Sequence, residues 1–279
     1  MNLQGKICLV TGATDGIGFI TARELARQGA DVIIHGRSAD KGRKAIAAIQ
    51  GETGKAPRFV QADFSSLEAV RQLGRELDDS LPRLDVLVNN AGRGPAASHE
   101  LSKDGHELVF AVNHLAPFLL TNLLLDKLRA AGTARVVNVS SVGHKFKPLF
   151  DIEDLMSEKV KPIHSYGRSK FANILFSNEL ARRMAGTDVT SNALHPGTIR
   201  SNFGHEATVT RIFYRLAGPL LKTPEQGART MIYLATSPEV AGRSGGYYVD
   251  SKLAPTHPKV NEPGLAEALW AASERLVGL

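Results

Sequence analysis

The sequence predicts the α/β class, with one domain built on a doubly wound parallel sheet of about seven strands and helices on both faces. Three observations predict it. Short β-branched apolar runs alternate with longer helical patterns along the chain. Most of these runs are apolar throughout rather than alternating, which is typical of strands covered on both faces. No linker rich in proline, glycine or serine, and no repeat, divides the 279 residues, so a single domain over 1–279 is expected.

The expected strands are the short apolar runs, and the expected helices are the segments between them with apolar residues at helical spacing. We expect strands at Ile7–Val10, Asp31–His35, Arg58–Gln61, Val86–Asn89, Arg135–Val139, Thr190–Leu194 and Tyr247–Val249. We expect helices near 17–28, 40–50, 66–78, 104–130, 166–185, 224–236 and 262–277. Two stretches, 142–164 and 198–222, interrupt this alternation. Insertions at the carboxyl ends of strands are where α/β proteins place substrate-contacting loops.

The basic residues are scattered over the sequence. Lys and Arg number 34 against 28 Asp and Glu, which gives a net charge of +6. No run of about five Lys or Arg residues appears of the kind that binds nucleic acid or a membrane surface. We therefore expect no nucleic-acid partner. A mildly positive field would instead attract a polyanionic cofactor.

The cysteine content and the apolar stretches predict a cytoplasmic protein. The one cysteine, Cys8, lies in an apolar run, so we expect it to be buried, and an intrachain disulfide is impossible. The most apolar stretch, 115–125, is interrupted by Thr121 and Asn122 and is too short to span a bilayer. No signal-peptide pattern precedes the first expected strand. No membrane span is expected.

A glycine-rich turn joins the first expected strand to the first expected helix. It reads Thr11-Gly12-Ala13-Thr14-Asp15-Gly16-Ile17-Gly18. Glycines let a backbone approach a pyrophosphate closely, and the following helix N-terminus offers free N–H groups to the anion. The spacing G-x-x-x-G-x-G differs from the commonest dinucleotide fingerprint, and a structural tight turn is the alternative. The candidate phosphate-loop residues are Gly12, Thr14, Asp15, Gly16, Ile17 and Gly18.

Cations follow the second expected strand, where an acidic residue would receive the ribose 2′-hydroxyl of NAD. This chain has Arg37, with Lys41 one turn into the next helix. Such cations suit the additional 2′-phosphate of NADP, although Arg37 could also be an ordinary surface residue. Asp63, after the third strand, could cap the following helix or accept a hydrogen bond from an adenine amino group.

Tyr166 and Lys170 form the candidate catalytic pair in the segment Tyr-Gly-Arg-Ser-Lys. Four residues apart on an expected helix, they share a face. A phenol is a poor acid or base at neutral pH, and a nearby ammonium lowers its pKa. Tyr166 could then give a proton to a carbonyl or take one from an alcohol. Alone, this spacing also occurs by chance on ordinary helices.

Small and polar residues follow three further strands at the same expected edge of the sheet. These segments are Asn89-Asn90-Ala91-Gly92, Asn138-Val139-Ser140-Ser141 and His195-Pro196-Gly197-Thr198. In open α/β sheets, ligands bind along the carboxyl edge. Asn113 lies inside the expected helix 104–130, where an asparagine needs a reason such as a hydrogen bond to its side chain, or else marks a kink.

Taken together and in order, these motifs resemble the short-chain dehydrogenase/reductase family. They are Thr11-Gly12-x-x-x-Gly16-Ile17-Gly18, Asn89-Asn90-Ala91-Gly92, Asn113, Ser141, Tyr166-x-x-x-Lys170 and Pro196-Gly197, and they cover nearly the whole chain. The resemblance implies a Rossmann-type domain that binds NADP(H). It also implies that the helices 104–130 and 166–185 could form the interface of a homodimer or homotetramer, although their apolar faces could equally be buried within the chain.

The resemblance implies a role for each site residue. Tyr166 would be the general acid/base and Ser141 would bind the substrate oxygen, with Ser140 as the alternative serine. Lys170 would bind the nicotinamide ribose and tune Tyr166, while Asn113 would hold a water in a proton relay. The implied cofactor-binding set is Gly12, Thr14, Asp15, Gly16, Ile17, Gly18, Arg37, Lys41, Asp63, Phe64, Asn90, Ala91, Gly92, Tyr166, Lys170, Pro196, Gly197 and Ile199, and no metal is implied.

The resemblance extends to the retinol dehydrogenase-like and WW-domain oxidoreductase-like branch. Ser141 and Tyr166 are 25 positions apart, more than is usual in the family. The segments Ser169-Lys170-Phe171-Ala172-Asn173 and Lys222-Thr223-Pro224-Glu225-Gln226-Gly227-Ala228 are also similar to that branch. Members of the branch often carry a membrane anchor, which the sequence does not show.

The expected function is NADP(H)-dependent interconversion of a small-molecule carbonyl and its alcohol. The two long loops would wall an apolar pocket, lined by Phe146, Phe150, Phe203, Ile212, Phe213 and Leu216; each of these could instead be ordinary packing. A non-catalytic NADP(H)-binding sensor or scaffold is the alternative from another class. A sugar-nucleotide epimerase or dehydratase, which shares the Tyr-x-x-x-Lys pattern, is a further alternative.

Overall fold

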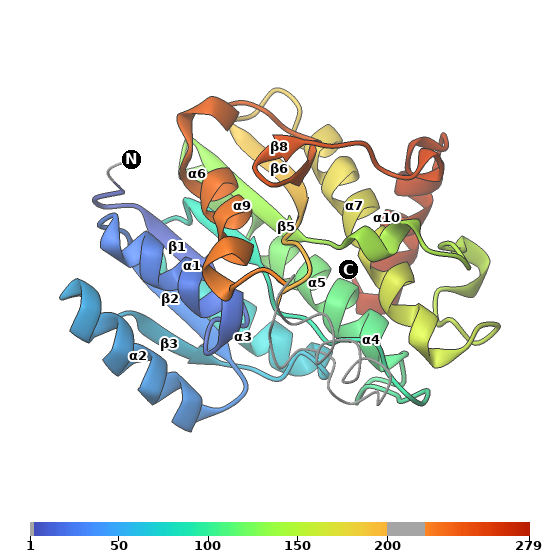
Figure 1. The fold of residues 1–279 in the computed structure, drawn as a ribbon, viewed down its shortest axis with the longest axis horizontal. Coiled ribbons are helices and arrows are strands. Elements are labelled where there is room, and N and C mark those ends of the chain that lie inside the picture. Colours follow the sequence, from blue (N-terminus) through green and yellow to red (C-terminus); the bar gives the residue numbers. More distant parts are fainter. Residues whose placement is uncertain (1–2, 200–220) are drawn as a thin grey trace.

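The computed structural model describes residues 3–199 and 221–279, and their strands form one eight-stranded sheet (Figure 1). The strand order is β3-β2-β1-β4-β5-β6-β7-β8. All neighbouring strands are parallel except β8, which is antiparallel to β7. The strands are β1 (Ile7–Val10), β2 (Asp31–Gly36), β3 (Arg58–Gln61), β4 (Val86–Asn89), β5 (Ala134–Val139), β6 (Val189–His195), β7 (Tyr247–Val249) and β8 (Lys252–Leu253).

The seven strands predicted from the sequence are all present, and their ends agree to within one residue. The eighth strand was not predicted. It has only two residues, both exposed, and it forms by folding back on β7 after Asp250 and Ser251, which adopt positive φ angles of 52° and 61°. A two-residue exposed strand carries no apolar run, so its pattern is invisible in the sequence.

Helices cover both faces of the sheet, as the doubly wound class requires (Figure 1). One apolar core lies under α1 (Gly16–Arg27), α2 (Ala39–Thr53) and α9 (Pro224–Thr236). The other lies under α3 (Leu67–Ser80), α5 (Ala116–Leu123), α7 (Ser165–Arg183) and α10 (Leu265–Val277). Cys8 is fully buried in the first of these cores, as expected.

The single helix expected at 104–130 is divided into four segments. They are α4 (Leu108–Phe110), the π-helix η1 (Ala111–Leu115), α5 and α6 (Leu125–Ala130). The π-helical turn contains Asn113, the residue whose place in a helix needed a reason, and such turns are frequent at functional sites. Leu124 interrupts the helix between α5 and α6 with φ −101° and ψ 8°. Apolar periodicity continues through all four segments, so the sequence pattern does not show these breaks.

The C-terminal helix α10 covers the outer side of α5 and α7. Its Trp270 ring packs against Phe118 and Phe176, with ring centroids 4.9 Å and 5.8 Å away. The Arg183 guanidinium lies over the Trp270 ring, 4.2 Å from its centroid. The apolar faces of α5 and α7 are therefore buried within the chain. Among the described helices, none combines the length and apolar character needed to cross a membrane.

Candidate active site

The predicted site residues lie along the carboxyl edge of the sheet, where β1, β2, β4, β5 and β6 end (Figure 1). The segment after β4 leads through α4 into η1. The segment after β5 leads into η2 (Val142–Lys145), and α7 packs against η2. Parallel strands place all their carboxyl ends on one side, so segments distant in the sequence meet there.

The glycine turn after β1 is packed tightly against the end of β4. Gly12 has a φ of 63°, and a Cβ on it would lie 2.8 Å from Ala91 Cα. A Cβ on Gly18 would lie 2.4 Å from Asn90 Nδ2, which itself donates hydrogen bonds to the carbonyls of Thr11 (2.7 Å) and Gly12 (3.1 Å). No larger residue fits at either glycine.

His35, near the end of β2, holds the glycine turn through a hydrogen bond. It was not identified from the sequence as a site residue. Its Nδ1 accepts a hydrogen bond from Gly12 N–H at 3.3 Å, and its Nε2 lies 3.1 Å from the Ala62 carbonyl. Burial lowers the pKa of His35 to about 4, so the ring is neutral and can accept on Nδ1 while donating from Nε2. The only sequence feature that pointed to this role was a lone histidine at the end of an apolar strand.

Arg37 and Lys41 are both exposed just beyond β2, on the side of the glycine turn. Lys41 Nζ lies 3.9 Å from Asp15 Oδ2, and Asp15 caps the N-terminus of α1. Thr14 packs on Gly36, since a Cβ on that glycine would lie 2.6 Å from Thr14 Cγ2. The turn, the start of α1 and the end of β2 therefore form one continuous surface with two cations.

Asp63 does not cap α3, which corrects one of the two expectations for it. Ser66 is the N-cap, accepting from Ala69 N–H, while Asp63 Oδ1 accepts from Ser65 N–H at 3.0 Å. Burial opposes ionisation of Asp63, but the Ser65 hydrogen bonds and the charges of Arg37 and Lys103 hold its pKa below the ordinary value. The next residue, Phe64, is buried and stacks on His35 with ring centroids 4.2 Å apart.

The two serines at the end of β5 are engaged differently. Ser140 is buried and its hydroxyl donates to the Lys170 backbone carbonyl at 2.7 Å. Ser141 Oγ accepts from Gly143 N–H at 3.1 Å, which leaves its own O–H available to donate. A Cβ placed on Gly143 would lie 3.5 Å from Ser141 Oγ and 3.6 Å from Tyr166 Cε1, so these two side chains flank one position.

Tyr166 and Lys170 lie on the first turns of α7, as the spacing predicted. Lys170 Nζ is 5.7 Å from the centroid of the Tyr166 ring and donates to the Val139 carbonyl at 3.0 Å. Burial lowers the pKa of Lys170 to about 8. Gly167 lets α7 approach closely, since a Cβ there would lie 2.8 Å from the Gly143 carbonyl oxygen.

Asn113 connects the π-helical turn to α7 and to the segment after β4. Its side chain accepts from Arg93 N–H at 2.6 Å and donates to the Arg93 carbonyl at 3.0 Å and to Ser169 Oγ at 2.9 Å. A Cβ on Gly92 would lie 3.1 Å from Asn113 Oδ1 and 3.5 Å from Lys170 Nζ. The structure therefore brings Gly92, Asn113 and Lys170 together.

The segment after β6 adjoins the glycine turn. Gly197 has a φ of 95°, and Pro196 precedes it. Ile199 is buried, and a Cβ on Gly227 of α9 would lie 2.5 Å from Ile199 Cδ1 and 3.0 Å from Ile17 Cγ2. Ile17 and Ile199 thus pack on the same small residue.

The long loop 142–164 contributes core packing as well as exposed apolar surface. Phe150 is buried and stacks on Phe171, with ring centroids 5.4 Å apart and planes at 4°. Of its two expected roles, pocket lining and ordinary packing, the structure shows packing. Phe146 is 65% exposed. The remaining expected pocket residues, Phe203, Ile212, Phe213 and Leu216, and most of the loop 198–222 lie outside the described residues.

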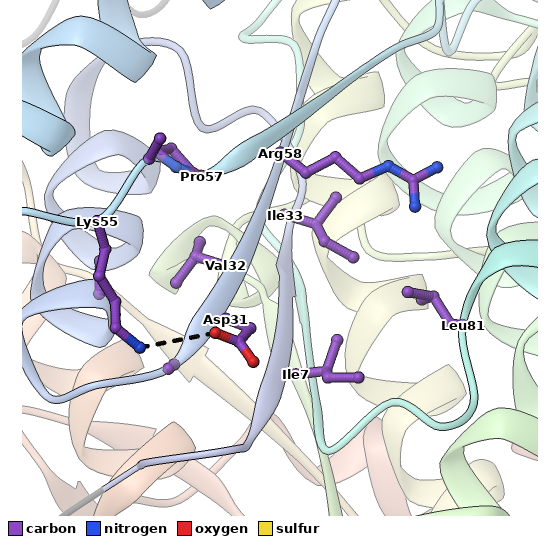
Figure 2. A pocket seen from close by; sticks show the side chains of 11 residues that line it. Ile7, Asp31, Val32, Ile33, Lys55, Pro57, Arg58 and Leu81 are labelled. Carbon is purple, nitrogen blue, oxygen red and sulfur yellow. Dashed lines mark ion pairs between the residues drawn. The ribbon is translucent and has the colours of Figure 1, made fainter.

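A hollow on the opposite edge of the sheet contains no predicted site residue (Figure 2). It lies at the amino ends of β1, β2 and β3, where Figure 2 shows Lys55 reaching toward Asp31. Lys55 Nζ lies 3.6 Å from Asp31 Oδ1 and donates to the Gly29 carbonyl at 2.7 Å. The second cation of the hollow, Arg58, pairs with Glu76 at 2.7 Å. Both cations are thus already engaged, and we do not associate this hollow with the chemistry at the carboxyl edge.

The chain is similar in sequence to known dehydrogenases. A family model described as short chain dehydrogenase matches residues 6–211. Human retinol dehydrogenase 14 is 41% identical over 296 aligned residues, covering 99% of this chain and 88% of that protein. Human retinol dehydrogenase 13 is 40% identical, covering 99% and 86%.

Solved structures show the same fold. A crystal structure of an uncharacterized protein from Mycobacterium paratuberculosis superposes with a TM-score of 0.79 at 32% identity, covering 99% of this chain and 95% of that one. A short chain dehydrogenase from Escherichia coli CFT073, crystallised with NADPH, superposes with a TM-score of 0.71 at 27% identity, covering 90% and 98%.

Proposed function

The chain belongs to the short-chain dehydrogenase family, as a retinol dehydrogenase-like alcohol/carbonyl oxidoreductase, and we propose that it transfers hydride between NADP(H) and an apolar carbonyl or alcohol with Tyr166 as general acid/base. The observation that carries the proposal is the meeting of Tyr166, Lys170, Ser141 and Asn113 beside the glycine turn.

The carboxyl edge fits a dinucleotide. Gly12 and Gly18 let the turn pack closely on the segment after β4, where a Cβ would clash, and the N-terminus of α1 presents N–H groups to a pyrophosphate. Arg37 and Lys41 would hold the 2′-phosphate of NADP, which agrees with the NADPH complex of the similar Escherichia coli enzyme. Asp63 would accept from the adenine amino group beside Phe64. When bound, NADP(H) supplies or accepts the hydride.

Tyr166 would move the proton at the substrate oxygen. The Lys170 ammonium is buried beside its ring, and a nearby positive charge stabilises a phenolate. Lys170 would also donate to the nicotinamide ribose. Its hydrogen bond to the Val139 carbonyl holds the ammonium in place, so its orientation does not depend on substrate.

Ser141 would hydrogen-bond the substrate oxygen opposite Tyr166. Its Oγ is oriented by Gly143 N–H, and the hydroxyl of Ser140 is already donated to the Lys170 carbonyl. Asn113 would hold the water of a proton relay. Its side-chain bonds to Arg93 and Ser169 fix the π-helical turn against α7.

The substrate is proposed to be apolar for two reasons. The similar human proteins are retinol dehydrogenases by name. In addition, Phe146 is 65% exposed on the loop that follows Ser141, where an apolar ligand would cover it. The exposed Val142 precedes it on the same loop.

The test is turnover of NADPH, followed by its absorbance, against a panel of retinal, other apolar aldehydes and ketones, and polar sugars. We expect turnover with the apolar carbonyls and little with the sugars. Tight NADPH binding without turnover on the whole panel would overturn the proposal and favour the sensor or scaffold function. Turnover restricted to sugars would overturn the apolar substrate class.

A further inference from the structure

The imidazole of His144, three residues after the candidate catalytic serine, is bound through both ring nitrogens. Its Nδ1 lies 2.6 Å from the Ser141 carbonyl oxygen, and its Nε2 accepts a hydrogen bond from His257 N–H at 3.2 Å. Because Nε2 accepts, the ring proton must lie on Nδ1 and be donated to Ser141. These two bonds define one tautomer of the neutral ring.

The surroundings of His144 keep the ring neutral and oriented. The side chain is buried, and its ring packs edge-on against Tyr247 with centroids 5.0 Å apart. Burial lowers the pKa of His144, as do the charges of Lys145 and His257, against the opposing effect of the bond to Ser141. The imidazole of His195 on β6 also interacts with it electrostatically. A proton on Nε2 would face the His257 N–H and break that contact.

The bond from His144 acts on the backbone that aims the serine. The Ser141 carbonyl also accepts from the His144 backbone N–H at 3.2 Å, so one residue binds this oxygen twice. Ser141 is the N-cap of η2, and its Oγ accepts from Gly143 N–H within that short helix. Turning the Ser141 carbonyl would turn η2 and move the Oγ away from the position it shares with Tyr166.

We propose that His144 is a positioning residue that ties the Ser141 carbonyl to the C-terminal segment at His257 and so fixes the serine for catalysis. This inference rests on the proposed function of Ser141. The C-terminal segment continues through η7 (Pro258–Asn261) to α10, so the tie joins the catalytic edge to the part of the chain that covers α7.

Three substitutions separate the hydrogen bond from the packing. His144→Asn places an amide N–H near the position of Nδ1 and keeps donation to Ser141. His144→Gln carries its amide out to the position of Nε2 and loses that donation. His144→Phe keeps a ring against Tyr247 and loses both bonds. The readouts are kcat for carbonyl reduction, the Kd for NADPH by fluorescence, and thermal unfolding.

We expect His144→Gln and His144→Phe to lower kcat by roughly tenfold to a hundredfold, as misplacement of a catalytic group does, with the Kd for NADPH unchanged. His144→Asn keeps the donation that orients Ser141 and loses only the bond from His257, so its kcat should lie between that of the parent and that of His144→Gln. If His144→Phe does not fold, the comparison of Asn with Gln carries the test. Equal rates for Asn and Gln, or parent activity in the Gln variant, would overturn the proposal.

Ser141→Ala separates this inference from the function on which it rests. If Ser141→Ala keeps the parent rate, the proposed role of the serine is wrong. If Ser141→Ala is nearly inactive while all His144 variants are fully active, only the inference fails. In the double variant Ser141→Ala with His144→Gln, we expect no further loss beyond Ser141→Ala, because His144 acts through the serine. Additive losses would contradict that.

Discussion

The buried ion pair between Arg168 and Asp154 fastens the loop 142–164 to the helix that carries Tyr166. Both side chains are 4% exposed, and Arg168 Nη1 lies 2.7 Å from Asp154 Oδ2. The carboxylate also accepts from the N–H groups of Glu158 (2.9 Å) and Lys159 (3.3 Å). Burial opposes ionisation of Asp154, but these hydrogen bonds and the Arg168 charge hold its pKa below the ordinary value. Arg168→Met removes the charge and keeps much of the side-chain volume.

The expected loss follows from this geometry. At 2.7 Å and an effective dielectric constant of about 20, two unit charges attract by roughly 6 kcal/mol, and desolvation offsets much of this in the intact pair. In Arg168→Met the attraction is lost and the carboxylate stays desolvated. It can protonate instead, which from the ordinary pKa of 3.8 costs about 4 kcal/mol at pH 7. We expect the free energy of unfolding to fall by about 3–4 kcal/mol.

The pH dependence gives a second check. In the parent, the low pKa of Asp154 stabilises the fold above the ordinary pKa, and this is lost as pH falls through the folded value. In Arg168→Met the carboxyl has a raised pKa, so the variant regains stability as pH falls toward it. The difference in free energy of unfolding between the parent and Arg168→Met should therefore shrink from pH 7 to pH 5, by up to about 1.4 kcal/mol per pH unit.

Urea unfolding at the two pH values measures both effects. Arg129→Met is the matched control, because its pair with Asp126 is 47% and 87% exposed and should contribute under about 1 kcal/mol. A loss in Arg168→Met no larger than in this control, or a difference from the parent that does not shrink at pH 5, would refute the reasoning.

Three further predictions concern the cofactor, the core and the catalytic lysine. Arg37→Asp should raise the Kd for NADPH roughly tenfold to a hundredfold without weakening NADH, because a charge-assisted bond to the 2′-phosphate is lost; equal changes for both cofactors in fluorescence titrations would contradict this. Trp270→Ala should lower the free energy of unfolding by about 3–5 kcal/mol, since the ring is buried against two phenylalanines; a urea midpoint near that of the parent would argue against it. The kcat for carbonyl reduction should fall as pH rises through about 8, where Lys170 loses the charge that supports Tyr166; a profile that stays flat two units higher would exclude that role.

Much of the fold and several contacts of the site followed from the sequence because they rest on local patterns. The apolar runs predicted seven strands, since all are short and most are buried on both faces. The edge strand β3 is the partly exposed one. The pair Tyr166 and Lys170 share a helix face through spacing alone. The glycines at 12 and 18 were identified by their place after the first strand, and the Cβ clashes explain why glycine is needed there.

What the sequence did not predict depends on contacts between distant segments. The π-helical turn at Asn113 is held by Arg93 and Ser169, and no periodicity records those partners. For Phe150 the sequence left pocket lining and ordinary packing both open, and only the structure shows that it stacks on Phe171 in the core. Asp63 and Ser66 could each cap a helix by residue type, and only the backbone geometry after β3 selects Ser66.

Kinetics of Tyr166→Phe test the central claim most directly, because the substitution removes one hydroxyl and keeps the ring beside Lys170. With the carbonyl substrate found in the panel, we expect kcat to fall by roughly a hundredfold to ten-thousandfold, as the loss of a general acid does. The Kd for NADPH should be unchanged. A variant that binds NADPH normally and keeps a rate within severalfold of the parent would contradict the assignment of Tyr166 as the general acid/base.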